Sequence, residues 1–225
     1  MTTRVTFASK TGSDIAGELA EPSGAAKLPA VVLLQEYWGV NDHIRDLTDR
    51  LAKEGFLVLA PDLYHGKTTT DASEAGKLAA ALDTLVAVKD IAGATAFLKA
   101  HPRSNGKVGV VGFCLGGALA LASACHVDGL SAVASFYGVP PAEKVDYAKV
   151  TAPIFAHVAK RDAWVTVDKV EAIQKQLDAR GRSMEIHVYD ADHAFMNDTR
   201  PQVYDAASAK VAWDRTLAFF RKHLA

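Results

Sequence analysis

The chain is poor in cysteine and has no long apolar run. Its two cysteines, Cys114 and Cys125, are eleven residues apart. One expected helix would hold them about 16 Å apart, too far for a disulfide. No group of cysteines and histidines has the spacing of a zinc site. No apolar segment approaches the ~18 residues of a membrane span. We therefore expect no disulfide, no metal, no organic cofactor and no membrane-spanning helix.

Neither sign of charge is in marked excess. The chain has 25 lysines and arginines against 26 aspartates and glutamates, a net charge of −1 at pH 7, and its basic residues are scattered. Without a basic patch, we expect neither a nucleic acid nor a membrane surface as partner. Segment 1–7 lacks the apolar core of a secretion signal. The expectation is a cytoplasmic protein that works as a monomer.

Strand and helix patterns alternate along residues 1–225, which we expect to form a single domain. Segments 4–8 and 15–20 predict an antiparallel pair with its turn at 10–13. The expected strands after them are 29–34, 56–60, 107–111, 131–136, 153–158 and 183–189. The expected helices run from Asn41 or Asp42 to Gly55, then over 71–100, where Gly76 and Gly93 mark a break or close packing, and over 117–122, 167–180 and 201–223. This order predicts an α/β fold, with a mostly parallel sheet and helices on both faces.

Cys114 lies where an expected strand turns sharply into an expected helix. Gly112 and Gly116 stand two residues before and two residues after it. A nucleophile on such a strained turn needs these positions nearly empty, so that strand and helix can approach. The positive N-terminal end of the following helix would favour a thiolate. The alternative is a buried structural cysteine, since free cysteine is among the most buried residue types.

An acid and a histidine follow Cys114 in the order that such a nucleophile requires. Asp162 comes after the expected strand 153–158, and His193 comes after 183–189. Asp190 and Asp192 are nearer to His193 in sequence, but they share its loop. Of the other histidines, His157 and His187 are expected within strands, and the expected surface positions are His43, His65, His101, His126 and His223. We therefore predict a triad of Cys114, Asp162 and His193.

The chemistry of these side chains assigns a role to each of them. A free thiol has a pKa of about 8.5 and gains from an imidazole that takes its proton. His193 would be that base, and Asp162 would fix its tautomer and stabilise the imidazolium. The backbone N–H groups of Leu115 and Tyr37 are the candidates for an oxyanion hole.

Glu36 is unusual because it ends a buried strand beside the expected oxyanion loop. A carboxylate there is costly to desolvate unless a partner pairs with it. We hypothesise that the Cys114 thiol is this partner, held protonated until substrate displaces the carboxylate. The alternative is an ordinary solvated glutamate.

These motifs together resemble the dienelactone hydrolase family of α/β-hydrolases. The resemblance rests on segments 35–41, 60–64, 112–117 and 135–138, on Asp162 and on 193–195, which spread over nearly the whole chain. It implies that Cys114, Asp162 and His193 form the triad, that Glu36 pairs with the resting thiol, and that Tyr37 and Leu115 line the oxyanion hole. It also implies hydrolysis of a small carboxylic ester or lactone through an acyl-cysteine.

The chain departs from the family where a substrate carboxylate would bind. Family members that act on dienelactone are expected to hold its carboxylate with two arginines. Asn197 occupies the place of one, four residues after His193, and residues 66–88 contain no arginine for the other. Arg200 is the next arginine after His193 and could reach the site from another angle. The resemblance therefore implies the same type of reaction, but it does not imply that dienelactone is the substrate.

Several aromatic residues are expected in loops at the carboxyl ends of strands, where open α/β sheets bind ligands. With Asn197, the expected pocket residues are Trp38, Tyr64, Tyr137, Trp164 and Phe195. Packing in the core or at its rim is the alternative for each aromatic side chain. Two other functions compete with the hydrolase: a thiol-based redox sensor, and a binding module without catalysis on the same fold.

Overall fold

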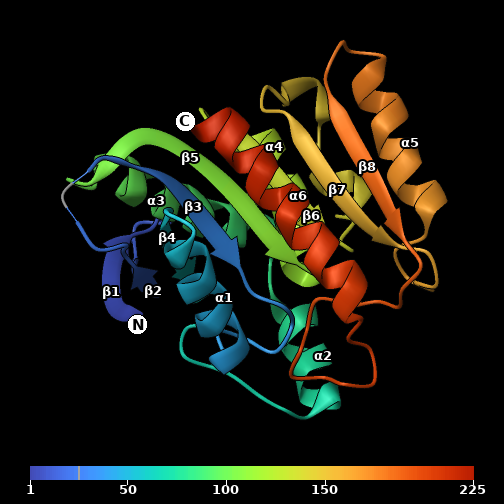
Figure 1. Ribbon diagram of the computed structural model, residues 1–225, viewed down its shortest axis with the longest axis horizontal. Coiled ribbons are helices and arrows are strands. Elements are labelled where there is room, and N and C mark those ends of the chain that lie inside the picture. The colour runs from blue at the N-terminus through green and yellow to red at the C-terminus, as the bar shows by residue number, and fades with distance from the viewer. Residues whose placement is uncertain (25) are drawn as a thin grey trace.

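A computed structural model describes residues 1–24 and 26–225 of the chain (Figure 1). One eight-stranded sheet runs through it in the order β1-β2-β4-β3-β5-β6-β7-β8. The strands are β1 (Thr3–Ala8), β2 (Asp14–Ala20), β3 (Leu28–Leu34), β4 (Leu57–Pro61), β5 (Ser104–Phe113), β6 (Ala132–Phe136), β7 (Ile154–Ala159) and β8 (Met184–Tyr189). Strands β1 and β2 pair antiparallel, and β2 pairs antiparallel with β4. The other neighbours pair parallel, which confirms the mostly parallel sheet.

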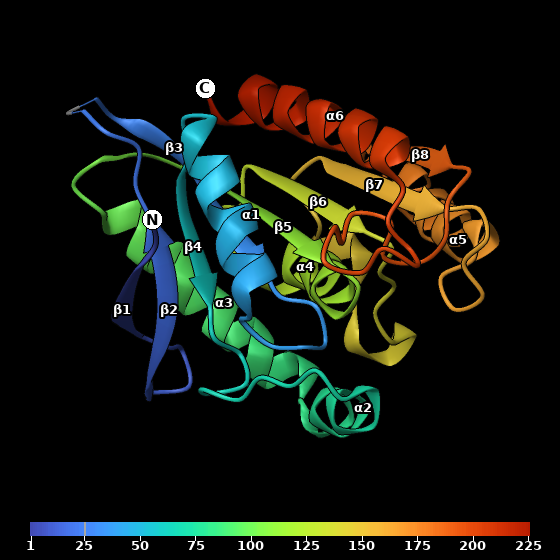
Figure 2. The same cartoon turned by 60° about the horizontal axis from the view of Figure 1, so that its bottom comes forward.

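Helices cover both faces of this sheet, as the alternating pattern predicts (Figures 1 and 2). The α-helices are α1 (Asp42–Lys53), α2 (Ala72–Ala81), α3 (Thr84–Ala100), α4 (Leu115–His126), α5 (Val167–Asp178) and α6 (Ala206–Leu224). Two short 3₁₀ helices, η1 (Ala142–Lys144) and η2 (Tyr147–Lys149), lie between β6 and β7. No helix among the described residues has the length and apolar character needed to cross a membrane.

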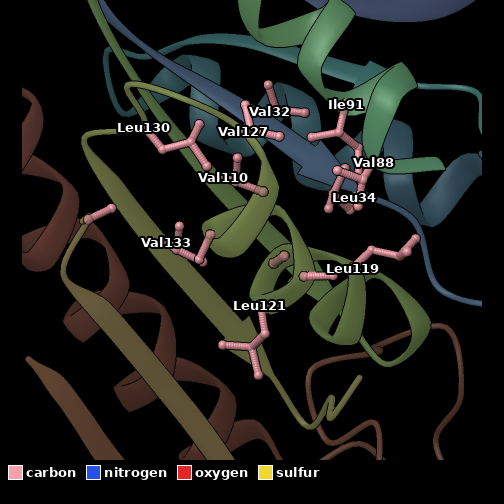
Figure 3. Packing of buried hydrophobic residues seen from close by; sticks show 14 of the residues in the cluster. Val32, Leu34, Val88, Ile91, Val110, Leu119, Leu121, Val127, Leu130 and Val133 are labelled. Atoms are coloured by element: carbon pink, nitrogen blue, oxygen red, sulfur yellow. The ribbon is translucent and has the colours of Figure 1, made fainter. Parts of the chain in front are cut away.

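The two faces of the central strands bury two separate apolar cores. Side chains alternate between the faces of a strand, so Val32 and Leu34 of β3 join one core while Val31 and Leu33 join the other. The first core contains side chains of α3, α4 and α5 (Figure 3), and the second contains those of α1 and α6. The strand β3 is continuously apolar because both of its faces are covered.

The expected helix over 71–100 is two helices in the structure. The first ends at Ala81, and Asp83 begins the second by accepting hydrogen bonds from the N–H groups of Leu85 and Val86. The break therefore lies at residues 82–83 and not at Gly76, because the Asp83 side chain caps the start of a new helix there. Gly93 marks close packing, because a Cβ on it would lie 2.4 Å from the Ala8 carbonyl oxygen.

The last helix begins at Ala206, so the expected start at Pro201 is wrong. The N–H groups of Val203 and Tyr204 both donate to the Arg200 carbonyl, which makes a turn after Arg200. Asp205 then caps the helix by accepting a hydrogen bond from Ser208 N–H at 2.7 Å. A connection of sixteen residues, 190–205, thus lies between β8 and α6.

Candidate active site

Four predicted functional residues lie at one edge of the sheet. Glu36 follows β3, Cys114 follows β5, Asp162 follows β7 and His193 follows β8. The carboxyl ends of parallel strands share an edge, so the order of the strands brings together residues far apart in sequence.

Cys114 occupies a strained turn between β5 and α4. Its φ of 56° and ψ of −115° lie outside the regions that residues with a side chain prefer. The turn requires the two glycines that the sequence places around it. A Cβ on Gly112 would lie 2.0 Å from the Gly116 carbonyl oxygen, and a Cβ on Gly116 would lie 2.5 Å from the Leu34 carbonyl oxygen. The turn holds the half-buried thiol at the N-terminal end of α4, whose dipole stabilises negative charge.

His193 is oriented by a carboxylate on its far side. Its Nδ1 lies 2.5 Å from Oδ2 of Asp162, so that the ring N–H donates to the carboxylate. Burial opposes protonation of the ring. The hydrogen bond with Asp162 and the nearby Cys114 sulfur outweigh burial, and together they raise the pKa of His193 to about 10. An imidazolium on His193 is therefore stabilised when the Cys114 sulfur carries a negative charge.

Asp162 remains charged although its side chain is fully buried. Its Oδ1 accepts hydrogen bonds from the backbone N–H groups of Trp164 at 2.8 Å and Val165 at 3.0 Å. Burial alone would raise its pKa, but the bonds from His193 and from the two N–H groups hold the pKa below its usual value. The alternative acids, Asp190 and Asp192, both bind Arg161 instead.

Glu36 is buried with fewer hydrogen-bond donors at its carboxylate than Asp162 has. Its Oε2 accepts a hydrogen bond of 2.5 Å from Nδ2 of Asn197, and its Oε1 has no hydrogen-bond partner among the described residues. Burial raises the pKa of Glu36 to about 7, although Asn197, His193 and Arg200 oppose the rise. The structure therefore shows Glu36 bonded to Asn197, and the hypothesised bond with the Cys114 thiol is not formed in it.

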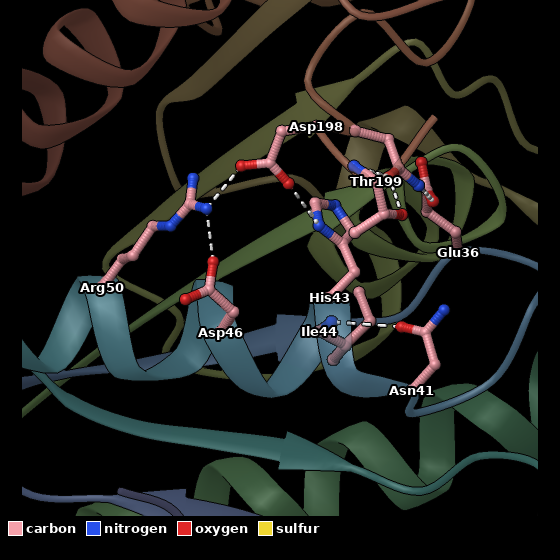
Figure 4. A network of polar contacts seen from close by, with 9 residues as sticks. Glu36, Asn41, His43, Ile44, Asp46, Arg50, Asp198 and Thr199 are labelled. Atoms are coloured by element: carbon pink, nitrogen blue, oxygen red, sulfur yellow. Dashed lines mark hydrogen bonds and ion pairs between the residues drawn. The ribbon is translucent and has the colours of Figure 1, made fainter. Parts of the chain in front are cut away.

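A chain of polar contacts continues from Glu36 to α1 (Figure 4). Oδ1 of Asn197 accepts hydrogen bonds from the backbone N–H and the hydroxyl of Thr199. The next carboxylate, Asp198, lies 3.3 Å from Nδ1 of His43 and 2.5 Å from a guanidinium nitrogen of Arg50. These contacts fix the segment that carries Asn197 against both ends of α1.

Two histidines of the chain are structural. His43 is 3% exposed, which corrects its expected surface position, and burial lowers its pKa despite the nearby Asp198. His157 lies within β7 as expected, between the hydroxyls of Tyr189 and Thr216 at 2.8 Å each. Desolvation holds the pKa of His157 well below its usual value. Both are neutral core groups near pH 7.

A cavity of about 770 Å³ opens at Cys114. The predicted residues that line it are Glu36, Tyr37, Trp38, Cys114, Leu115, Tyr137, Trp164 and His193. Tyr137 and Trp164 flank His193, with ring centroids 5.0 Å and 5.3 Å from the imidazole. The cavity is large enough for a small-molecule ligand.

Three residues expected in the pocket are not among those that line the cavity, which corrects the expectation for them. Tyr64 is buried, and its hydroxyl has no partner among the described residues. Phe195 is fully buried and packs on Phe136 and Tyr137. Asn197 is 1% exposed and holds Glu36. Each follows a strand as predicted, but its side chain is buried and does not line the cavity.

Other residues that line the cavity were not singled out from the sequence. They include Ala79, Leu82, Ala118, Val139 and Val203. These are ordinary apolar residues, and no local pattern distinguishes them from core positions. Arg200, which the sequence indicates as an arginine that could reach the site, also lines the cavity, and its guanidinium lies 5.3 Å from the ring centroid of Trp38.

The oxyanion candidates both border the cavity. Leu115 is the first residue of α4, so its N–H has no acceptor within the helix. Tyr37 lies in a turn after β3 that the hydrogen bond from Gly39 N–H to the Glu36 carbonyl closes. No group of three or more histidine, cysteine, aspartate or glutamate side chains in the described part of the chain is arranged to hold a metal ion.

Comparison with a family model matches residues 15–224 to the dienelactone hydrolase family. A relative from Aquifex aeolicus (strain VF5), named "Putative carboxymethylenebutenolidase", is 34% identical over 227 residues, which cover 96% of both chains. A relative from Bradyrhizobium sp, named "Probable 2-oxo-3-(5-oxofuran-2-ylidene)propanoate lactonase", is 32% identical over 92% of this chain and 88% of its own.

A solved structure has the same fold over nearly the whole chain. It is the crystal structure described as "Putative Dienelactone Hydrolase" from Klebsiella pneumoniae subsp. pneumoniae MGH 78578. The two superpose with a TM-score of 0.86 at 30% sequence identity, covering 98% of this chain and 99% of the other.

Proposed function

The chain belongs to the dienelactone hydrolase family of α/β-hydrolases, and on that premise we propose that it cleaves a small carboxylic ester or lactone through an acyl-cysteine on Cys114. The observation that carries the proposal is the position of His193. Its ring is bonded to Asp162 on one side, and it lines the same cavity as Cys114, whose sulfur contributes to raising its pKa. We take residues 1–225 as one catalytic domain, since the described strands form one sheet.

The reaction begins with proton transfer from the thiol to Nε2 of His193. The Cys114 sulfur attacks the ester carbonyl, and a sulfur–carbon bond forms. The carbon–oxygen bond then breaks as His193 returns the proton to the leaving oxygen. Water next loses a proton to His193, attacks the acyl-cysteine and releases the carboxylic acid with the free thiol. Asp162 stabilises the imidazolium in both halves.

The oxyanion of each tetrahedral intermediate would lie between the N–H groups of Leu115 and Tyr37. Both residues border the cavity beside Cys114. Preorganised donors of this kind are each worth about 10²–10³-fold in kcat.

Glu36 would act on the thiol through its charge. An ionised carboxylate beside the sulfur disfavours the thiolate, whereas the protonated form does not. With a pKa of about 7, Glu36 changes its charge near neutral pH. Because Asn197 holds one of its oxygens, the free Oε1 is the acceptor that remains for the thiol proton in the hypothesised resting state.

One experiment tests the hydrolase and its competitors together. The protein is incubated with p-nitrophenyl acetate, and the quenched protein is analysed by mass spectrometry. We expect turnover and an acetyl group on Cys114, with both absent in Cys114→Ala. An acetylated protein without turnover, or neither signal, contradicts the proposal.

The same protein also tests the redox alternative. Cys125, the other cysteine, is buried in α4, its Sγ donates to the Leu121 carbonyl, and burial raises its pKa to about 11. It therefore offers no resolving thiol for an oxidised Cys114. Reversible oxidation of Cys114 by mild peroxide, in a protein without esterase turnover, would favour a sensor.

A further inference from the structure

The cavity has an apolar wall on one side of Cys114. Ala118 and Leu119 contribute from the second turn of α4, Ala79 from α2, and Leu82 from the link between α2 and α3. Val139, in the connection after β6, completes this wall. Leu82 and Val139 are partly buried and pack on the apolar core below. A channel along an apolar wall of this kind lowers the free energy of an apolar ligand that displaces its water.

The charged residues of the cavity lie on other elements. Glu36 and Arg200 are on the side of Trp38, where Arg200 faces the indole ring. Arg161 lies at the mouth beside Asp192 and binds both Asp190 and Asp192. No lysine or arginine on α2, on α4 or in segment 139–141 lines the cavity within the described residues. The apolar wall therefore offers no partner for an anionic group.

The position of His193 decides which part of a substrate meets the apolar wall. His193 belongs to the connection between β8 and α6, and the rings of Tyr137 and Trp164 flank it, whereas the apolar wall comes from α4, α2 and the α2–α3 link. Because His193 must return its proton to the leaving oxygen, the leaving group lies on its side of Cys114. The acyl part then extends in the other direction, toward Ala118 and the α2–α3 link.

We propose that this enzyme prefers substrates with an uncharged, apolar acyl chain, bound in the channel that Ala79, Leu82, Ala118, Leu119 and Val139 form. The inference rests on the proposed hydrolase function and adds the substrate class. It also fits Asn197, which stands where the resemblance implies a carboxylate-binding arginine and whose side chain is buried and does not line the cavity.

The first test compares p-nitrophenyl acetate, butanoate and hexanoate with the wild-type protein. Each methylene that enters the channel should raise kcat/KM by about two- to fourfold. A p-nitrophenyl monoester of adipic acid has an acyl chain of the same length as hexanoate but ends in a carboxylate. It should react more slowly than the hexanoate ester, because its charge would be desolvated against the apolar wall.

The second test uses two neighbouring residues of α2. Ala79→Glu places a carboxylate in the channel wall, whereas Ala80→Glu makes the same change at an exposed position outside it. The ratio of kcat/KM for hexanoate over acetate should fall about tenfold or more in Ala79→Glu. It should stay at the wild-type value in Ala80→Glu. Thermal unfolding of both variants checks that they are equally folded.

The outcomes separate this proposal from the hydrolase proposal. If the wild-type protein cleaves p-nitrophenyl acetate but its kcat/KM does not rise with longer acyl chains, the apolar channel is overturned and the hydrolase proposal stands. A higher kcat/KM for the adipate monoester than for the hexanoate ester has the same meaning. Equal ratios in the two variants also overturn the channel. Failure to cleave any of the esters overturns both proposals.

Discussion

Two buried carboxylates of the candidate active site behave in opposite ways. Asp162 accepts hydrogen bonds from an imidazole and two backbone N–H groups, and its pKa lies below the usual value. Glu36 accepts one hydrogen bond, from the neutral amide of Asn197, and its pKa is raised to about 7. Both side chains are out of contact with water, so the number and charge of their donors make the difference.

Asp162 and Glu36 therefore have different electrostatic roles in the site. On the side of Asp162, the structure keeps a fixed negative charge that stabilises the imidazolium formed when His193 takes a proton. On the side of Glu36, the charge is lost or gained within the physiological range. The site therefore combines a constant electrostatic element with one that responds to pH, and each can be altered separately.

The largest effect is expected from Asp162→Asn, which removes the fixed charge. The amide can no longer stabilise the imidazolium or enforce the tautomer that leaves Nε2 free for the thiol proton. We expect kcat for p-nitrophenyl acetate to fall by about 10⁴-fold, as in other triads. Chemical denaturation should show that the variant is folded. A fall of less than tenfold would contradict the role of Asp162.

Glu36→Gln should remove the pH response instead. The pKa of Glu36 is about 7 in the folded protein and 4.5 as a model value. Its protonated form therefore contributes stability that is complete below pH 4.5 and is lost as the pH rises through 7. Glutamine does not titrate and can keep an acceptor toward Asn197. The free energy of unfolding of Glu36→Gln, relative to wild type, should rise by about 3 kcal/mol between pH 4 and pH 8.5.

Urea denaturation of the two proteins at both pH values measures this difference. A difference that does not change with pH would show that Glu36 is not the titrating group. The pH profile of kcat/KM provides a second readout, since an inflection near pH 7 should be present in wild type and absent in the variant.

The site also shows which of its features can be predicted from the sequence. The strands, the elbow and the order of Cys114, Asp162 and His193 depend on local patterns: glycines around a turn, and an acid or histidine directly after a strand. These patterns suffice to place the residues at one edge. The direction of a side chain within its loop does not follow from them. Tyr64, Phe195 and Asn197 are therefore buried and do not line the cavity, although each follows a strand.

Contacts between distant segments explain the other differences. The partner of Glu36 is 161 residues away in the chain, and that of Arg50 is 148 residues away. The start of α6 at Ala206 depends on the Asp205 cap, while the residues before it contribute Arg200 and Val203 to the cavity. The buried position of His43 depends on the same connection. No periodicity in the sequence carries this information.

A smaller effect is expected from Asn197→Leu, which removes the amide donor of Glu36 but keeps a side chain of similar size. The ionised carboxylate then loses its one hydrogen bond, so the pKa of Glu36 should rise further. We expect a loss of about 2 kcal/mol in the free energy of unfolding at pH 8.5 and a smaller loss at pH 5, where Glu36 is protonated. In a Glu36→Gln background the pH dependence of this loss should vanish. A loss that is equal at both pH values in the wild-type background would refute the coupling.

The smallest effect is expected from Arg50→Gln, at the outer end of the same chain of contacts. Arg50 binds Asp46 and Asp198, but its side chain is 41% exposed, so water screens both ion pairs. We expect a loss of at most about 1 kcal/mol in the free energy of unfolding, reduced further in high salt. Lys53→Gln, at an exposed position on the same helix, is the matched control.

Since Thr199 and His43 still hold the segment that carries Asn197 in Arg50→Gln, the inflection of kcat/KM near pH 7 should not move. An inflection that shifts in Arg50→Gln but not in Lys53→Gln would mean that surface charge on α1 sets the ionisation of Glu36, and the contrast between the two carboxylates would then depend on this ion pair as well as on Asn197.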